Sequence, residues 1–442
     1  MKPMLYTLLV SFVLTASAAN LFAYPLDGWQ EMGISRLQGF DPKQGARGAP
    51  RLPEGARQES QTIRLNLTQT DPTLDLDESH RDPALQKALE GVFLSRDPSY
   101  GVVVADMSDP SRLVWAGVRA DRPQMPGSVG KVLTMLGLFH ELARAFPDIE
   151  ARRTLLRSRR VTAGEWVKWD EHKVPLYDPQ TNTVRSATIQ PGDHFTLAEW
   201  VDHMISASAN GAAATVWKET VLLRHFGDRY PPSKEEEAHF FRTTPKPALW
   251  HLARSAVVEP MEAVGLRWKH FKVGSFWTKT AKTLIPGEGG SVATPREMAR
   301  FLLRLEQGRL VDLWSSLEMK KFLYTTSRRY RYIFAPELAA SSAFFKSGSF
   351  YRCQAEAGFT CGKYQGNRDN LMNSLAIIES PAPTGPEQKR YFVALISNVM
   401  KKNSAWDHSR LGAAIDRLVQ TRMAVTVNEQ GKKEEIKASG GE

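Results

Sequence analysis

The chain has 442 residues, of which 42% are hydrophobic and 24% are charged, a composition typical of a soluble globular protein with a large core. Lysine and arginine number 58 against 48 aspartates and glutamates, and the net charge of +10 would suit an anionic partner such as cell-wall polymer, a membrane surface or nucleic acid. Because the basic residues are scattered in short runs, we interpret them as a solvated surface and expect no nucleic-acid partner.

Residues 1–23 show the three parts of a signal peptide. Lys2 supplies a positive charge, residues 4–14 form an apolar run, and small residues at 16–18 follow at the spacing that signal peptidase recognises. A second possible cut follows Ala23. The apolar run is too short to anchor the chain across a bilayer, and no cysteine stands near the cut to carry a lipid. We therefore expect an exported protein, periplasmic or secreted, without a stable membrane anchor.

Residues 24–79 are rich in proline, glycine, arginine, glutamine and aspartate and contain few apolar clusters. This composition predicts an extended N-terminal arm or linker. The strict alternation of apolar and polar residues from Ile63 to Leu67 predicts that part of the arm lies along the domain as an edge strand.

The compact domain is expected over residues 80–425 and begins with a helix near residue 83. The apolar residues of this helix fall on one side; they are Leu85, Leu89, Val92 and Phe93. Two β-rich runs, at 100–107 and 113–118, predict a hairpin. The hairpin leads to a turn at 126–130 that opens into an apolar-faced helix.

From about residue 132 to 340 the pattern is mostly helical, and threonines three residues before a glutamate mark helix starts at 196 and 294. Strand patterns return at 343–350, 375–378 and 391–397, followed by a helix at 407–420 and a polar, flexible tail at 426–442. This order predicts a mixed α/β (α+β) fold. A five-stranded, mainly antiparallel sheet is flanked by helices, and an all-helical lobe is inserted beside it.

The first candidate motif is Ser128-x-x-Lys131, at the start of the predicted helix. Residues three apart share a helix face, so the lysine nitrogen can reach the serine hydroxyl. A serine nucleophile with a lysine base requires this arrangement. Taken alone, Ser128 as a helix cap and Lys131 as a surface lysine are each a more frequent role for these residues than catalysis.

Two further motifs occur once each. Ser208-x-Asn210 follows the helix that starts at 196, and Lys346-Ser347-Gly348 lies in the strand at 343–350. Helix-end loop residues and a bulge in an edge strand are the plain structural alternatives. Three unique motifs in one order, on a helix start, a helix-end loop and a strand, favour a functional interpretation.

From about residue 82 to 419 the chain resembles the penicillin-recognising serine hydrolases. It is most similar to their class A β-lactamase-like branch, whose signature is Ser-x-x-Lys, Ser-Asp-Asn and Lys-Thr/Ser-Gly. The resemblance implies a β-lactamase/transpeptidase-like fold and an acyl-enzyme on Ser128. It implies substrates that are β-lactams, peptidoglycan-derived peptides or esters. A D-alanyl peptidase or an esterase is as compatible with the motifs as a true β-lactamase.

The resemblance also implies roles for the matched residues. Ser128 attacks a carbonyl, and its own N–H, at the positive end of a helix, stabilises the oxyanion. Lys131 takes the proton and must be neutral, so burial and the charge of Lys346 lower its pKa in the required direction. Ser208 relays a proton to the leaving nitrogen, and Asn210 holds the substrate amide or Lys131.

In the strand motif, Lys346 and Ser347 are expected to bind a substrate carboxylate. Gly348 leaves room for close approach of the backbone, and the N–H of Ser349 is the second oxyanion donor. These roles, too, follow from the resemblance and not from the spacing of the residues.

Two departures from the family pattern are visible. Ala209 stands where β-lactamases usually carry an aspartate that helps brace the site. The Glu-x-x-Leu-Asn motif, whose glutamate activates the deacylating water, is not found. An acyl-enzyme would then form and clear slowly. A non-catalytic or very slow cell-envelope-binding protein that retains the pocket is the alternative from another class.

Cys353 and Cys361 are the two cysteines of the chain. In an exported protein we expect them to close a small loop as a disulfide, with two free buried thiols as the alternative. The histidines show no metal-binding spacing and no cofactor motif is present. We therefore expect no metal, no cofactor, a small-molecule or peptidoglycan-derived substrate, and a monomer.

Overall fold

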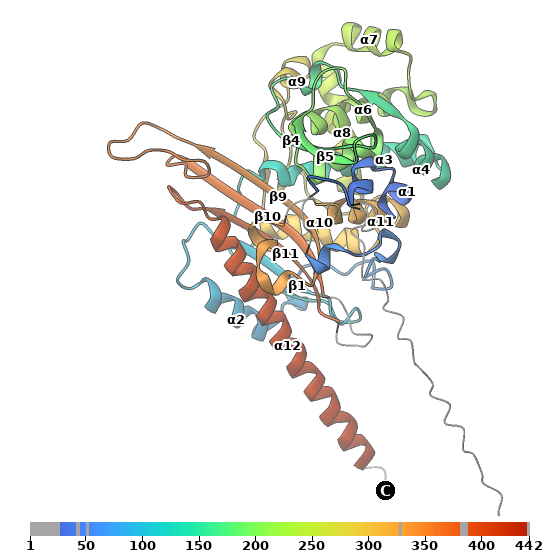
Figure 1. Cartoon of the computed structure of the whole chain (residues 1–442). Coiled ribbons are helices and arrows are strands. Elements are labelled where there is room, and N and C mark those ends of the chain that lie inside the picture. The colour runs from blue at the N-terminus through green and yellow to red at the C-terminus, as the bar shows by residue number, and fades with distance from the viewer. Residues whose placement is uncertain (1–26, 41–44, 50–52, 327–328, 381–387, 440–442) are drawn as a thin grey trace, which may run out of the picture.

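The computed structural model describes residues 27–40, 45–49, 53–326, 329–380 and 388–439. Its centre is a five-stranded sheet in the order β2-β1-β11-β10-β9, in which all neighbouring strands are antiparallel (Figure 1). The strands are β1 (Gly101–Asp106), β2 (Val114–Val118), β9 (Ser342–Arg352), β10 (Asp369–Glu379) and β11 (Arg390–Asn398). The predicted five-stranded sheet flanked by helices is confirmed.

Alternate residues of the sheet enter two separate cores, as the two-residue period of a strand requires. Val104 of β1 shares one core with helices α2 (Pro83–Phe93) and α12 (Ala405–Ser439). Ala105 enters the opposite core, which it shares with α10 (Pro295–Glu306). The helical stripes predicted for α2 and α12 supply buried residues to the first core: Leu85, Leu89, Phe93, Leu411, Ile415 and Val419.

The chain between β2 and β9 forms the helical lobe and the helices on one sheet face (Figure 1). Besides α10, its helices are α3 (Lys131–Ala145), α4 (Ile149–Ser158), α5 (Leu197–Ile205), α6 (Asn210–Phe226), α7 (Lys234–Thr243), α8 (Lys246–Ala263), α9 (Lys279–Leu284) and α11 (Leu313–Tyr324). The predicted caps are present: Thr196 and Thr294 each accept a hydrogen bond from the backbone N–H three residues on.

The prediction that this lobe is all-helical is wrong, because three two-stranded sheets interrupt it. They pair β3 (Arg160–Thr162) with β6 (His194–Thr196), β4 (Lys173–Asp178) with β5 (Thr183–Thr188), and β7 (Phe271–Lys272) with β8 (Val292–Ala293). The β4–β5 hairpin has a local cause. Its strands contain β-branched and aromatic residues, and the Pro-Gln-Thr-Asn sequence between them, which follows Asp178, favours a turn.

The segment from residue 27 to 79, expected to be an extended arm, instead packs into the domain where the structure describes it. It contains α1 (Gly28–Met32) and short 3-10 turns, and it has no strand at Ile63–Leu67. Isolated apolar side chains, spaced too widely to form a visible cluster, fill gaps in the main core; they are Met32, Ile34, Leu37, Ile63, Leu67 and Leu76.

The C-terminal helix also differs from expectation. A helix was predicted at 407–420 with a flexible tail from 426, whereas α12 continues to Ser439. The predicted signal peptide, 1–23, lies outside the described residues. Within the described part of the chain, no helix is both long and apolar enough to cross a membrane.

Candidate active site

Ser128 lies in a single 3-10 turn that leads directly into α3. The turn touches β9 so closely that neither adjoining glycine has room for a side chain. A Cβ on Gly127 would lie 2.9 Å from the nitrogen of Ser349, and a Cβ on Gly348 would lie 2.2 Å from the carbonyl oxygen of Pro126. Gly127 also has a φ of +52°, which glycine adopts without strain. Ser128 is thus held between the sheet and the lobe, and Gly348 makes room for the turn that carries it.

Lys131 is the first residue of α3, and its side chain is fully buried. Its Nζ donates to Ser128 Oγ at 3.1 Å, to the carbonyl oxygen of Ser208 at 2.6 Å and to Asn210 Oδ1 at 2.7 Å. All three acceptors are neutral. Burial lowers the pKa of Lys131 to about 7, although the negative charge of Asp170 opposes the shift. At neutral pH a large fraction of Lys131 therefore carries no charge and can accept a proton from Ser128.

The Ser-x-Asn motif forms the sharp turn between α5 and α6. Ser208 has a φ of +64°, in the left-handed region that a non-glycine residue adopts at a cost of about 1–2 kcal/mol. The turn is fixed by the N–H of Ala209, which donates to the carbonyl oxygen of His203 at 3.0 Å. This conformation directs the carbonyl of Ser208 and the amide of Asn210 to the same ammonium, that of Lys131.

Lys346 reaches the same turn from β9. Its Nζ donates to Ser208 Oγ at 2.9 Å and to the carbonyl oxygen of Ser347 at 2.9 Å. Burial, together with the charges of Lys131 and Arg331, holds the pKa of Lys346 well below its usual value. Ser208 therefore stands between two buried lysines, with its carbonyl on one and its hydroxyl on the other.

Two residues that belong to none of the three motifs contact the β9 residues of the site. Tyr330 OH lies 2.6 Å from Ser347 Oγ, and Arg331 Nη2 donates to Ser349 Oγ at 3.0 Å. Arg331 is buried and has a φ of +58°. An arginine in a short loop of mixed composition has no distinguishing sequence signal, so sequence reasoning missed it. No carboxylate pairs with Lys131, Lys346 or Arg331 among the described residues.

Asp170 was also missed, because it lies in the loop before β4 and far from the three motifs in sequence. Its Oδ2 accepts a hydrogen bond of 2.7 Å from the N–H of Gly211, the residue after Asn210. Its Oδ1 lies 2.6 Å from Nδ1 of His172. Burial alone would raise the pKa of Asp170, but the hydrogen bonds and charge of His172 and the N–H of Gly211 outweigh it and lower that pKa.

Trp277, between β7 and α9, covers another side of Lys131. The ammonium nitrogen lies 5.0 Å from the centre of the indole ring, a cation–π distance, and Trp277 Nε1 donates to Thr134 Oγ1 at 3.3 Å. Two glutamates of the lobe pair with basic residues away from Lys131: Glu237 with Lys218 and Glu259 with Arg224. Among the described residues, an indole ring therefore lies beside Lys131, and neither of these glutamates is paired with it.

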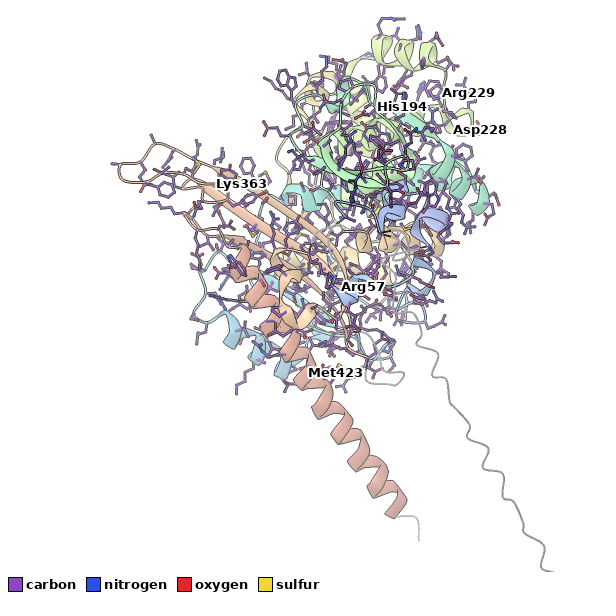
Figure 2. The ribbon with its side chains drawn as sticks, in the orientation of Figure 1. Arg57, His194, Asp228, Arg229, Lys363 and Met423 are labelled. Carbon is purple, nitrogen blue, oxygen red and sulfur yellow. A yellow bond between two sulfur atoms is a disulfide. The ribbon has the colours of Figure 1, made fainter. Side chains whose placement is uncertain are left out.

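The expected disulfide between Cys353 and Cys361 is present, with the two Cα atoms 6.2 Å apart. It closes the loop between β9 and β10. This hairpin projects from the sheet, and Lys363, labelled in Figure 2, lies on it. Within the described ranges, no three histidine, cysteine, aspartate or glutamate side chains gather as they would around a metal ion.

No family model and no curated protein matches the chain. Three solved structures with a similar overall arrangement are a β-lactamase from Sphaerobacter thermophilus, the TLA-3 extended-spectrum β-lactamase and PBP-A. Their identities to this chain are 15%, 14% and 14%, and their TM-scores are 0.46, 0.48 and 0.42. The alignments cover 77%, 77% and 79% of this chain and 97%, 98% and 97% of those chains. Because these TM-scores are below 0.5, the likenesses carry no functional assignment, and we infer function from the side-chain geometry of the site.

Proposed function

We propose that the chain is an exported serine hydrolase that forms an acyl-enzyme on Ser128 with β-lactam, peptidoglycan-peptide or ester substrates. The observation that carries this proposal is the contact between Lys131 and Ser128. A buried lysine with a pKa of about 7 lies 3.1 Å from a serine hydroxyl, and that serine is only partly buried. A nucleophile with an adjacent base tuned to neutral pH is the arrangement that covalent acyl transfer needs.

In the proposed step, neutral Lys131 takes the proton of the Ser128 hydroxyl while Oγ forms a bond to the substrate carbonyl carbon. The N–H groups of Ser128 and Ser349 stabilise the resulting oxyanion. The carbonyl then re-forms as the bond to the leaving nitrogen or oxygen breaks. The leaving atom takes a proton from the hydroxyl of Ser208, which Lys346 replaces, so that charge and protons balance over the step.

The three basic side chains of the site support a substrate that carries a carboxylate. Lys131, Lys346 and Arg331 lie near one another and form no ion pair in the described structure, and the cost of burying an unpaired charge is what lowers the pKa of the two lysines. A carboxylate bound between Lys346 and Arg331 would supply the missing negative charge. It would also raise the pKa of Lys346, so that this lysine is protonated when it hands a proton to Ser208.

Intact-mass spectrometry tests this proposal. Incubation with a penicillin and, separately, with a fluorophosphonate is expected to add one adduct to the protein, and Ser128→Ala is expected to abolish both adducts. Absence of an adduct on the wild-type protein, or an adduct that survives Ser128→Ala, would refute acyl transfer through this residue. Muropeptides, chromogenic cephalosporins and small esters, compared on wild type and Ser128→Ala, then separate the substrate classes.

The second candidate is a non-catalytic or very slow cell-envelope-binding protein. The position of Trp277 over Lys131 favours it, because an aromatic ring cannot activate a water molecule for deacylation. Steady turnover of any ester or amide that is lost on Lys131→Ala would contradict this candidate. Stoichiometric capture of a β-lactam without further product release would support it.

A further inference from the structure

We propose that Asp170 is a positioning residue that supplies, from outside the three motifs, the negative charge that braces the Ser208–Asn210 turn and acts on Lys131. The inference rests on the proposed function of this site and deepens it. It begins from the hydrogen bonds of the two lysines in the site. Lys131 donates to three neutral acceptors, Lys346 donates to two more, and neither lysine forms an ion pair among the described residues.

The geometry of Asp170 fits this role. Its side chain is only 6% exposed, and its carboxylate lies between two hydrogen-bonding groups. Oδ2 accepts from the N–H of Gly211 at 2.7 Å and Oδ1 contacts Nδ1 of His172 at 2.6 Å. The N–H of Gly211 is in the first turn of α6 and has no partner within that helix, so the carboxylate satisfies a group that would otherwise be orphaned.

The loop that carries Asp170 is pressed against the same point of α6. A Cβ on Gly211 would lie 3.0 Å from the Cα of Val167, so the two backbones touch. The preceding residue, Trp169, has a φ of +67° and is 81% exposed. This left-handed turn sends Trp169 into solvent and Asp170 inward. The neighbouring position in the motif is Ala209, which has no side chain that could cap α6.

The charged groups around Lys131 come from three elements. Lys346 of β9 is repelled by both Lys131 and Arg331, and Asp170, which pairs with His172, attracts Lys131 from the loop before β4. Asp170 is the negative charge in this set. Removing it disfavours the ammonium form of Lys131, so the pKa of Lys131 falls and the base becomes neutral at lower pH.

Three variants separate the effect of the Asp170 charge from the effect of its hydrogen bond to the N–H of Gly211. Asp170→Asn keeps an oxygen that can accept from Gly211 but removes the charge, whereas Asp170→Ala removes both. Glu171→Gln removes one charge from the adjacent, exposed residue and is the matched control. The acid limb of the pH profile of acylation is expected to move to lower pH by about one pH unit in Asp170→Asn and Asp170→Ala. Only Asp170→Ala should also lose roughly tenfold or more in the limiting rate.

A second measurement does not depend on activity. NMR titration of ¹³C-lysine-labelled protein, with the Lys131 resonance assigned from Lys131→Arg, reports the pKa of Lys131 in the resting protein. The pKa is expected to be lower in Asp170→Asn than in wild type and unchanged in Glu171→Gln. Equal Lys131 titrations in wild type and Asp170→Asn would overturn the proposal. If wild type forms no Ser128 adduct but the titrations differ as stated, the proposed function fails and the role of Asp170 stands.

Discussion

The ammonium nitrogen of Lys131 lies 3.1 Å from the hydroxyl oxygen of Ser128, and its pKa of about 7 places its loss of charge in the neutral range. A lysine base acts only when neutral. The acylation rate constant is therefore expected to rise about tenfold per pH unit below pH 7 and to level off above it. Stopped-flow or quenched mass measurements of penicillin acylation between pH 5 and 9 provide the profile.

Lys131→Ala is expected to lower the acylation rate by about 10²- to 10⁴-fold, the usual loss when a general base is removed. Lys168→Ala, at an exposed lysine of the same lobe, serves as the control and should acylate like wild type. A flat profile through pH 7, or a Lys131→Ala protein that acylates at the wild-type rate, would contradict the assignment of Lys131 as the base.

Arg331 is expected to contribute to recognition of the substrate carboxylate. Its guanidinium donates to Ser349 Oγ and has no acidic partner among the described residues. Arg331→Gln should lower kcat/KM or the acylation efficiency for a penicillin by about 10- to 100-fold, because a charge-assisted hydrogen bond contributes about 1.5–3 kcal/mol. Arg331→Lys should lower kcat/KM by a smaller factor, since the positive charge remains but the two-pronged guanidinium that binds both carboxylate oxygens is lost.

An uncharged ester gives the matched comparison for Arg331. Its hydrolysis is expected to change less than threefold in Arg331→Gln, because it has no carboxylate to bind. Arg368→Gln, on the exposed part of the β9–β10 hairpin, controls for a general change of surface charge. Equal losses for the penicillin and the ester would indicate that Arg331 shapes the site without binding the carboxylate.

Most helices and strands of the sheet could be predicted from the sequence, because their signals are local periodic patterns of apolar residues. The two-residue period of the strands and the apolar stripes of α2 and α12 correspond to real faces, because burial acts on every residue of such an element. The three motifs also meet in the structure, with Ser208 in contact with both lysines. Segment 27–79 was misjudged because its buried side chains are isolated in sequence and become a core only against other elements.

The residues missed in the site share one property. Asp170, Trp277, Tyr330 and Arg331 each act through a contact made across the fold, from loops whose sequences resemble any other loop. A position beside Lys131 can be filled from several segments, and no local pattern shows which segment arrives. The absence of a Glu-x-x-Leu-Asn motif was visible in the sequence, whereas the indole ring that lies against Lys131 was not.

Trp277 is expected to give the acyl-enzyme a long lifetime. A chromogenic cephalosporin should produce a burst of about one product per protein, followed by much slower turnover, because Lys131 lies 5.0 Å from an indole ring and pairs with no carboxylate among the described residues. Trp277→Glu would place a carboxylate beside the base and is expected to shorten the lifetime at least tenfold. Trp277→Gln, which has the same length but no charge, should not. Equal lifetimes in Trp277→Glu and Trp277→Gln, with both proteins folded, would show that this position does not control deacylation.

The buried ion pair between Arg36 and Asp202 is expected to join the N-terminal segment to the lobe energetically. Arg36 Nε and Nη2 donate to the two oxygens of Asp202 at 2.6 and 2.7 Å, and both side chains are almost completely buried. Arg36→Met leaves the carboxylate buried and unpaired, which should lower the free energy of unfolding by about 3–5 kcal/mol. Arg185→Gln, at an exposed arginine of β5, is the control and should change it by less than about 0.5 kcal/mol.

The pH dependence of this pair has a defined sign. Burial alone would raise the pKa of Asp202, but the charge and hydrogen bonds of Arg36 outweigh it and hold that pKa below its usual value. The stabilisation is therefore complete above the unfolded pKa near 4 and is lost as pH falls through the lower folded pKa. Urea unfolding at pH 7 and pH 3 should show a larger difference between wild type and Arg36→Met at pH 7. Equal free energies of unfolding for Arg36→Met and wild type at pH 7 would mean that this pair does not hold segment 27–79 to the lobe.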